Sequence, residues 1–147
     1  MTNYDDPEIE EQWCTERRAE VAEYLMREGV KHGRVGEWPA WHVAPYVSIW
    51  AIESSKQPEY VGWWVLCGDL PTDYISAENI KHPRDAILAI ARRWLDASSL
   101  MARGEQPPTM SIGPVENGLE LAPLLETRAN ILIKWANDRS LWEEKAL

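Results

Sequence analysis

The sequence predicts an α+β fold, in which an antiparallel β-hairpin or small sheet is covered by about three main helices. Two segments rich in β-branched and aromatic residues lie in the middle of the chain, and amphipathic helical patterns lie before and after them. A length of 147 residues, 45% hydrophobic and 27% charged, is typical of one soluble globular domain. We therefore expect residues 1–147 to form a single domain.

The first helix is expected to begin near Asp6-Pro7-Glu8 and to end at Gly29. Asp6 can cap the helix, Pro7 suits the first helical position, and early acidic residues favour the helix dipole. Apolar side chains recur at near-helical spacing, while charged side chains fill the other face. The apolar positions are Ile9, Trp13, Cys14, Val21, Tyr24 and Leu25.

Two strands are expected, one from His42 to Glu53 and one from Tyr60 to Cys67, joined by a turn over residues 54–59. Because the turn is short, an antiparallel hairpin is the simplest pairing. Both strands are apolar on both faces, so the hairpin must be covered twice. Helices are the available covers.

Two further long helices are expected after the hairpin, the first from Pro83 to Gly104. A loop follows from Gly104 to Gly118, and a short strand around Met110 to Ile112 could lie within it. The string Ser140-Leu141-Trp142-Glu143 has capping-box spacing and is expected to open a final short helix. The apolar positions of the third long helix are Leu121, Leu124, Leu125, Leu132 and Trp135.

The hairpin pairing predicts where ionisable and aromatic residues gather. Facing residues should have numbers that sum to roughly 113, so His42 should lie opposite the segment from Asp69 to Pro71. Trp38, Trp41 and Trp63 could wall a pocket at this end of the hairpin. The candidate binding patch consists of Glu37, Trp38, Trp41, His42, Trp63, Asp69, Asp73 and Tyr74.

A histidine beside carboxylates can act as a general base or a metal ligand, because the carboxylate orients the ring and raises its basicity. The sequence therefore admits an enzyme that uses His42 with Asp69 or Asp73. The competing interpretation is structural. In it, His42 and Asp69 form a polar pair that pins a loop, and Asp73 caps a short helical turn from Tyr74 to Glu78.

No cofactor and no metal site is expected. A metal would need His42 and His82 to converge with the two aspartates, and no phosphate-binding loop or dinucleotide fingerprint is present. His82 is expected instead at the cap of the second helix, and His32 in solvent just past the first. Cys14 and Cys67 are expected to be reduced, packed thiols, and Cys67 could be a nucleophile only if His42 reached it.

The net charge of −9, with fifteen dispersed Lys and Arg residues, argues against binding to DNA or RNA. The longest apolar run, residues 43–52, is about half the length of a membrane-spanning helix, so no membrane association is expected. The N-terminus has neither a basic start nor an apolar stretch, so the expected location is the cytoplasm. The acidic balance is compatible with a basic protein partner, and it is also common in cytosolic proteins.

Three strings give the chain a family resemblance. They are Gly36-Glu37-Trp38-Pro39-Ala40-Trp41-His42-Val43-Ala44-Pro45-Tyr46, the pair Gly62-Trp63-Trp64-Val65 and Gly68-Asp69-Leu70-Pro71-Thr72-Asp73-Tyr74, and Lys81-His82-Pro83-Arg84-Asp85. On these strings the chain resembles a family of short bacterial proteins known only as a domain of unknown function. The resemblance covers most of the chain and implies a bacterial, cytoplasmic setting. It brings no activity, ligand or catalytic residue.

Two classes of function therefore remain. The first is a non-catalytic domain that binds a peptide, a protein or a small molecule through the Trp-rich patch and the acidic surface, one variant being the neutralising partner of a basic toxin or enzyme. The second is a small hydrolase or metal-dependent enzyme that uses His42 with Asp69 or Asp73. We favour the first class. A homodimer is a further expectation, because apolar surface often ends in an interface.

Overall fold

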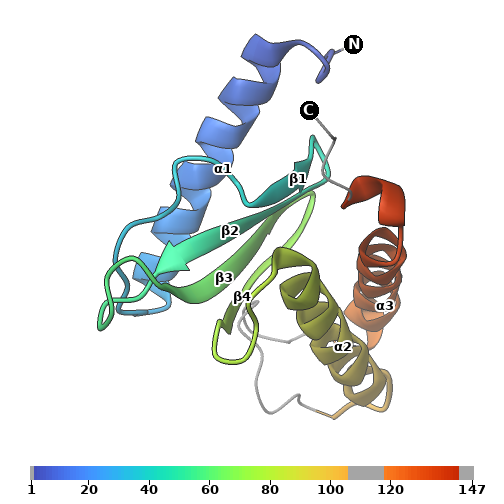
Figure 1. Ribbon diagram of the computed structural model, residues 1–147. Coiled ribbons are helices and arrows are strands. Elements are labelled where there is room, and N and C mark those ends of the chain that lie inside the picture. The colour runs from blue at the N-terminus through green and yellow to red at the C-terminus, as the bar shows by residue number, and fades with distance from the viewer. Residues whose placement is uncertain (1, 106–117, 143–147) are drawn as a thin grey trace. The chain divides into compact units, whose positions relative to one another are not determined.

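A computed structural model describes residues 2–105 and 118–142 (Figure 1). Over these residues it contains three α-helices, a four-stranded antiparallel sheet and one 3₁₀ helix, so the predicted α+β class is confirmed. The elements are α1 (Pro7–Arg27), β1 (Trp41–Val43), β2 (Val47–Glu53), β3 (Val61–Gly68), β4 (Leu70–Ser76), α2 (Pro83–Ala102), α3 (Gly118–Ala136) and η1 (Arg139–Leu141).

Contacts divide the chain into two compact units, Met1–Pro83 and Arg84–Leu147. The first contains α1 and the sheet, and the second contains nearly all of α2 together with α3 and η1. Each unit is described below by itself. That the whole chain forms a single domain stays a prediction.

Helix α1 begins and ends as the sequence predicts. The Asp6 carboxylate accepts a hydrogen bond from the Glu8 N–H at 2.9 Å, which satisfies a donor that the first turn leaves open. At the other end Gly29 has a φ of +67°, the left-handed conformation that glycine adopts without strain. The N–H of Gly29 donates to Met26 O and the N–H of Val30 to Leu25 O, the two hydrogen bonds of a Schellman motif.

The strands follow the order β1-β2-β3-β4, and every neighbouring pair is antiparallel. In the hairpin of β2 and β3, Trp50 lies opposite Val65. The predicted register would have placed Trp50 opposite Trp63. A difference of two residues keeps each side chain on its expected face, because side chains alternate along a strand.

The expected strand from His42 to Glu53 is wrong, because the chain reverses in its middle. The Ala44-Pro45 peptide is cis, and the Tyr46 N–H donates to Val43 O at 2.7 Å. Strand β1 therefore folds back on β2, with Val43 opposite Val47. The physical reason is that proline has no N–H to donate and is excluded from the interior of a ladder.

The segment after β3 also differs from the prediction, because residues 70–76 form β4 rather than a turn and a helical cap. Asp73 lies opposite Leu66, is fully buried, and accepts a hydrogen bond from the Tyr74 N–H at 2.8 Å. The expected helical cap at Asp73 is therefore wrong. Asp69 does lie in the turn before β4, where its N–H donates to Tyr46 O at 2.9 Å.

The turn between β3 and β4 requires glycine at position 68. Gly68 has a φ of +148°, and a Cβ atom there would lie 2.4 Å from Tyr46 O. The backbone of the turn between β1 and β2 therefore approaches this glycine more closely than any side chain would allow.

The core of the first unit lies between α1 and one face of the sheet (Figure 1). Val21, Tyr24 and Leu25 contribute the helix side of this core. The other buried members are Val35, Trp50, Ile52, Val65 and Cys67. Their burial removes a continuous apolar surface from water, which is the main force that holds α1 on the sheet.

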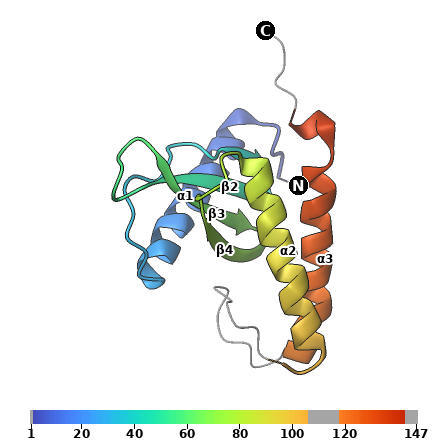
Figure 2. The same ribbon diagram turned by 60° about the horizontal axis from the view of Figure 1, so that its bottom comes forward.

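In the second unit, α2 and α3 lie side by side and run antiparallel (Figures 1 and 2). Arg84, in the first turn of α2, donates from Nε to Ala136 O at the end of α3 at 2.6 Å. The buried side of α3 follows a spacing of three and four residues. Its members are Ala122, Leu125, Ala129, Leu132 and Ala136.

Two smaller predictions concern the ends of these helices. Helix α2 begins at Pro83, directly after His82, and Gly104 with a φ of +75° follows its end. The final short helix is η1, but its cap is Asp138, whose carboxylate accepts from the Ser140 N–H at 3.1 Å, so the expected start at Ser140 is wrong. The expected strand at residues 110–112 lies outside the described residues.

Candidate functional site

The eight residues of the predicted patch do not form one site. His42 lies on β1 opposite Ser48, while Asp73 lies on β4 at the other edge of the sheet. Three strand spacings of about 4.8 Å separate these two strands, so their side chains lie on the order of 14 Å apart. The expected position of His42 opposite the segment from Asp69 to Pro71 is therefore wrong. The reversal at Pro45 is the cause, because it carries β1 to the far side of β2.

His42 has different neighbours, and two of them come from α1. Its Nε2 atom lies 3.6 Å from a carboxylate oxygen of Glu10, a distance that gives an ion pair only when the ring is protonated. The ring stacks on Trp13 with centroids 6.3 Å apart, and Trp38 meets it edge-on at 5.5 Å. Glu10 and Trp13 are three residues apart on α1 and so share a helix face. The three-residue spacing of Glu10 and Trp13 was a sequence signal that could have indicated a shared contact surface on α1.

Trp38 is held at the rim of the sheet although its side chain is 47% exposed. The backbone on either side pairs with β2, since the Gly36 N–H donates to Ala51 O at 3.2 Å and the Ala40 N–H donates to Ile49 O at 2.8 Å. Residues 37–39 bulge out between these two hydrogen bonds. Trp38 is therefore an exposed ring on a fixed backbone.

Arg18 on α1 fixes the start of this bulge. Its Nε donates to Gly36 O at 2.9 Å and its Nη2 donates to Val35 O at 3.0 Å. Such bonds from a charged donor are among the stronger ones in proteins. The guanidinium therefore ties α1 to the backbone that precedes Trp38.

Trp63 and Tyr74 belong to the other part of the sheet. Their rings meet edge-on at 5.6 Å, and Tyr74 also meets Tyr24 of α1 at 5.8 Å. The indole Nε1 of Trp63 donates to Lys31 O at 3.3 Å. Both side chains pack against the core under α1, so Trp63 does not share a pocket wall with Trp38. His32 nearby is half-buried with its Nδ1 atom 2.6 Å from Gly33 O, so the expectation that it lies in solvent is wrong.

Glu37 lines a groove, which we call the edge groove, with a volume of about 370 Å³. The groove lies within the first unit, next to Trp38 in the chain, and its size is within the range of ligand pockets. Its lining residues are Arg18, Arg34, Val35, Gly36, Glu37, Ala51, Glu53, Glu59, Tyr60 and Val61. Tyr60 and Val61 are 68% and 42% exposed, which gives the groove an apolar lip.

The carboxylates of the edge groove differ in the hydrogen bonds that they accept. Glu53 accepts hydrogen bonds from the N–H and Nη2 of Arg34 at 3.1 and 3.0 Å, and from the Glu59 N–H at 3.1 Å. These bonds lower the pKa of Glu53 to about 2, the side-chain bond from Arg34 being the largest cause. The carboxylates of Glu37 and Glu59 are exposed at the surface of the groove.

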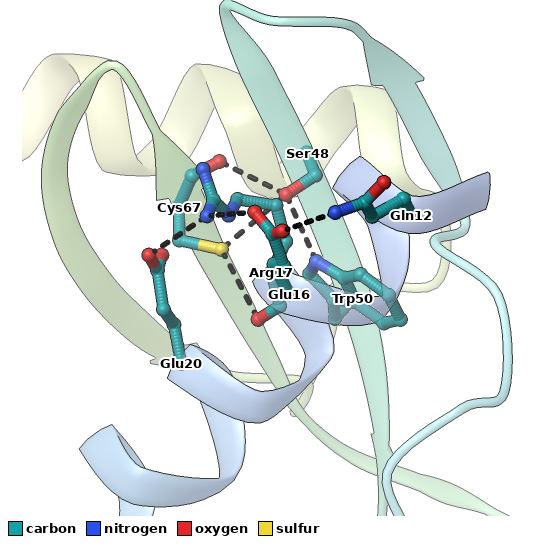
Figure 3. Close-up of polar contacts among 7 residues, drawn as sticks. All are labelled: Gln12, Glu16, Arg17, Glu20, Ser48, Trp50 and Cys67. Carbon is teal, nitrogen blue, oxygen red and sulfur yellow. Dashed lines mark hydrogen bonds and ion pairs between the residues drawn. The ribbon is translucent and has the colours of Figure 1, made fainter. Parts of the chain in front are cut away.

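A polar cluster lies under α1, close to the centre of the sheet (Figure 3). Ser48 Oγ donates to Cys67 O at 2.9 Å, accepts from the indole Nε1 of Trp50 at 2.9 Å, and lies 3.3 Å from Cys67 Sγ. The Cys67 thiol donates to Arg17 O at 3.8 Å, and the Arg17 guanidinium pairs with Glu20 at 3.1 Å. The cluster satisfies the polar groups of three buried side chains.

The two cysteines are free and buried, which confirms the prediction of packed thiols. Burial raises the pKa of Cys67 to about 11, and burial together with the negative charge of Glu10 raises the pKa of Cys14 to about 11. Both thiols are therefore protonated at neutral pH, and Ser48 stands between Cys67 and His42 in the pairing of the strands. These positions do not fit a cysteine nucleophile.

Within residues 2–105 and 118–142, no group of three or more His, Cys, Asp or Glu side chains could hold a metal ion. None of the helices in this part of the chain has the length and apolar character needed to cross a bilayer.

An antiparallel sheet packed on one helix, with a charged groove along its edge, defines the first unit of an α+β protein. The chain belongs to the family described as "Domain of unknown function (DUF4826)", whose sequence model matches residues 8–142. This finding confirms the resemblance to a domain-of-unknown-function family. Comparisons with curated proteins and with solved structures gave no match.

Proposed function

We propose that this protein is a non-catalytic domain that binds a basic segment of a protein partner in the edge groove, with Trp38 at its rim. The observation that carries the proposal is the groove itself, a hollow of about 370 Å³ whose lining residue Glu37 directly precedes the exposed Trp38 in the chain. The bacterial, cytoplasmic setting expected from the sequence belongs to this proposal.

The charges favour a basic partner. Arg34 pairs with Glu53, Arg18 donates to two backbone carbonyl groups, and the carboxylates that line the groove outnumber its two guanidinium groups by one. Glu37 and Glu59 present their carboxylates to solvent at the groove. The chain as a whole carries a net charge of −9, which attracts a cationic partner over a longer range.

The aromatic side chains favour a polypeptide partner over a free ion. Tyr60 and Trp38 offer large rings at the surface, and Trp38 is already oriented by its edge-on contact with His42. A ring held in place loses little conformational entropy on binding, and its face attracts a Lys or Arg side chain. Tryptophan and tyrosine are also enriched among the residues that dominate binding energy.

The positions of the ionisable groups support a non-catalytic role. The enzyme alternative needed His42 beside Asp69 or Asp73, and the order of the strands separates them. His42 is paired instead with Glu10 and enclosed by two indole rings. It lacks the open position next to a second reactive group that acid–base catalysis requires.

Isothermal titration calorimetry with a defined peptide pair tests the proposal. The probe is an eight-residue peptide of alternating lysine and leucine, and its control has glutamate in place of every lysine. We expect the lysine peptide alone to bind, and the variants Glu37→Lys and Trp38→Ala each to weaken it about tenfold. The matched control Glu23→Lys changes the net charge by the same amount on the exposed face of α1 and should have a much smaller effect. Equal losses in Glu23→Lys and Glu37→Lys, or no binding of the lysine peptide, would overturn the proposal.

A further inference from the structure

Helix α3 carries a second apolar row beside its buried one. The row, here called the outer stripe, consists of Leu121, Leu124, Arg128, Ile131 and Trp135. Its members are spaced by three and four residues, the spacing that places side chains along one line of a helix. Each member directly precedes a member of the buried row, so the apolar arc of α3 is wider than the part that is buried.

The first two members of the outer stripe are exposed, whereas the buried row is not. Leu121 and Leu124 are 41% and 62% exposed, whereas Ala122 and Leu125 beside them are 2% and 4% exposed. Arg128, Ile131 and Trp135 are intermediate. Exposed leucines at helical spacing on a helix that is otherwise well partnered mark a surface that another element covers.

The stripe is complementary to itself. A two-fold axis that passes between two copies of α3, level with Thr127 and Arg128, would place Leu124 of one copy beside Ile131 of the other. The same axis would place the first turn of one helix beside the last turn of its partner. Glu120 is the acidic residue of the first turn and Lys134 the basic residue of the last turn, so opposite charges meet twice.

From this pattern we propose that a second copy of this chain docks on the outer stripe, with the two α3 helices antiparallel. A two-fold interface requires one surface to match itself in both shape and charge, and a partner of different sequence would not impose that condition. The interface is separate from the edge groove, which belongs to the other unit of the chain.

One feature of the stripe opposes the association. Arg128 lies next to the proposed axis, so the two Arg128 side chains approach each other. This repulsion limits the affinity of the dimer. Replacing Arg128 by leucine should therefore tighten it, an effect that no role of Arg128 within a monomer would produce.

Sedimentation equilibrium of the full chain over a series of concentrations tests the proposal. We expect a reversible dimer that Leu124→Glu abolishes and Arg128→Leu tightens about tenfold. The control Glu126→Lys reverses a charge at an exposed position of α3 outside the stripe and should leave the dimer unchanged. Far-ultraviolet circular dichroism of each variant separates loss of association from loss of folding.

Exchanging the charges of Glu120 and Lys134 tests whether the two α3 helices are antiparallel. Glu120→Lys and Lys134→Glu should each weaken the dimer about tenfold, and the double variant should restore it. A chain that stays monomeric at every concentration would overturn the proposal. So would a dimer that is insensitive to Leu124→Glu, or one that the double exchange does not restore.

Discussion

Two aromatic pairs of the first unit have nearly the same local geometry and different surroundings. Trp38 meets His42 edge-on at 5.5 Å, and Trp63 meets Tyr74 edge-on at 5.6 Å. The second pair continues into the core through Tyr24, whereas Trp38 ends at the surface, one residue after Glu37 of the edge groove. The comparison teaches that the contact between two rings does not show whether a tryptophan supports the fold or is available to a partner. The groups that contact the other side of the tryptophan ring decide which of these two roles it has.

Stability measurements can break this comparison. Trp63→Ala should lower the free energy of unfolding by about 3 kcal/mol, because it removes a ring packed against the core and leaves a void. Trp38→Ala should cost less than about 1 kcal/mol, since its ring is half exposed. Urea denaturation of the two variants measures both values. Equal losses would mean that the two tryptophans have the same structural role.

The next largest effect concerns the reactivity of the two buried thiols. Cys14 lies one turn from Glu10 on α1, and its pKa of about 11 reduces the thiolate fraction about 100-fold relative to the ordinary value of 9.0. Cys67 should be equally slow. A colorimetric thiol reagent at neutral pH should therefore modify both cysteines only when the protein unfolds.

Glu10→Gln separates the two thiols. It removes a charge that raises the pKa of Cys14, so it should speed the alkylation of Cys14 and leave Cys67 nearly unchanged. Mass spectrometry of the alkylated peptides distinguishes the two sites. Rapid modification of either thiol in the native wild-type protein would show that the thiol is not buried as described.

The smallest effect concerns the acid dependence of the groove. The pKa of Glu53 is lowered from 4.5 to about 2, so its contribution to stability is present above 4.5 and is lost as the pH falls through 2. Arg34→Ala should return the pKa of Glu53 towards 4.5, since the bond from Arg34 is the largest cause of the shift. A carboxyl titration by nuclear magnetic resonance checks this. An unchanged pKa in Arg34→Ala would assign the shift to the backbone donors.

The sequence predicted those features that depend on neighbours in the chain. Asp6 and Gly29 bound α1 as expected, and the periodicity of α1 and α2 identified their buried sides, whereas Leu121 and Leu124 of α3, expected on its apolar side, are exposed. The faces of β2 and β3 were also correct, because side chains alternate whatever the register. Such features are set by local backbone chemistry and by patterns within one element.

The features that failed depend on pairing between distant segments. Pro45 excludes a continuous strand, but nothing local indicates that β1 folds back on β2. Likewise, the turn composition around Asp69 concealed β4, which is stabilised by its pairing with β3. The candidate site inherited both errors, since it assumed that two ends of one hairpin meet. Glu10 and Trp13 were missed because they reach His42 from another element.

The account rests on the claim that the rim at Trp38, and not the pair at Trp63, meets a partner. The most direct measurement follows the indole N–H signals of the protein by nuclear magnetic resonance while the alternating lysine and leucine peptide is added. We predict that the signal of Trp38 shifts with saturable dependence on peptide, that the signal of Trp63 stays in place, and that the glutamate peptide moves neither. A shift of Trp63 with a stationary Trp38, or equal responses to both peptides, would contradict the account.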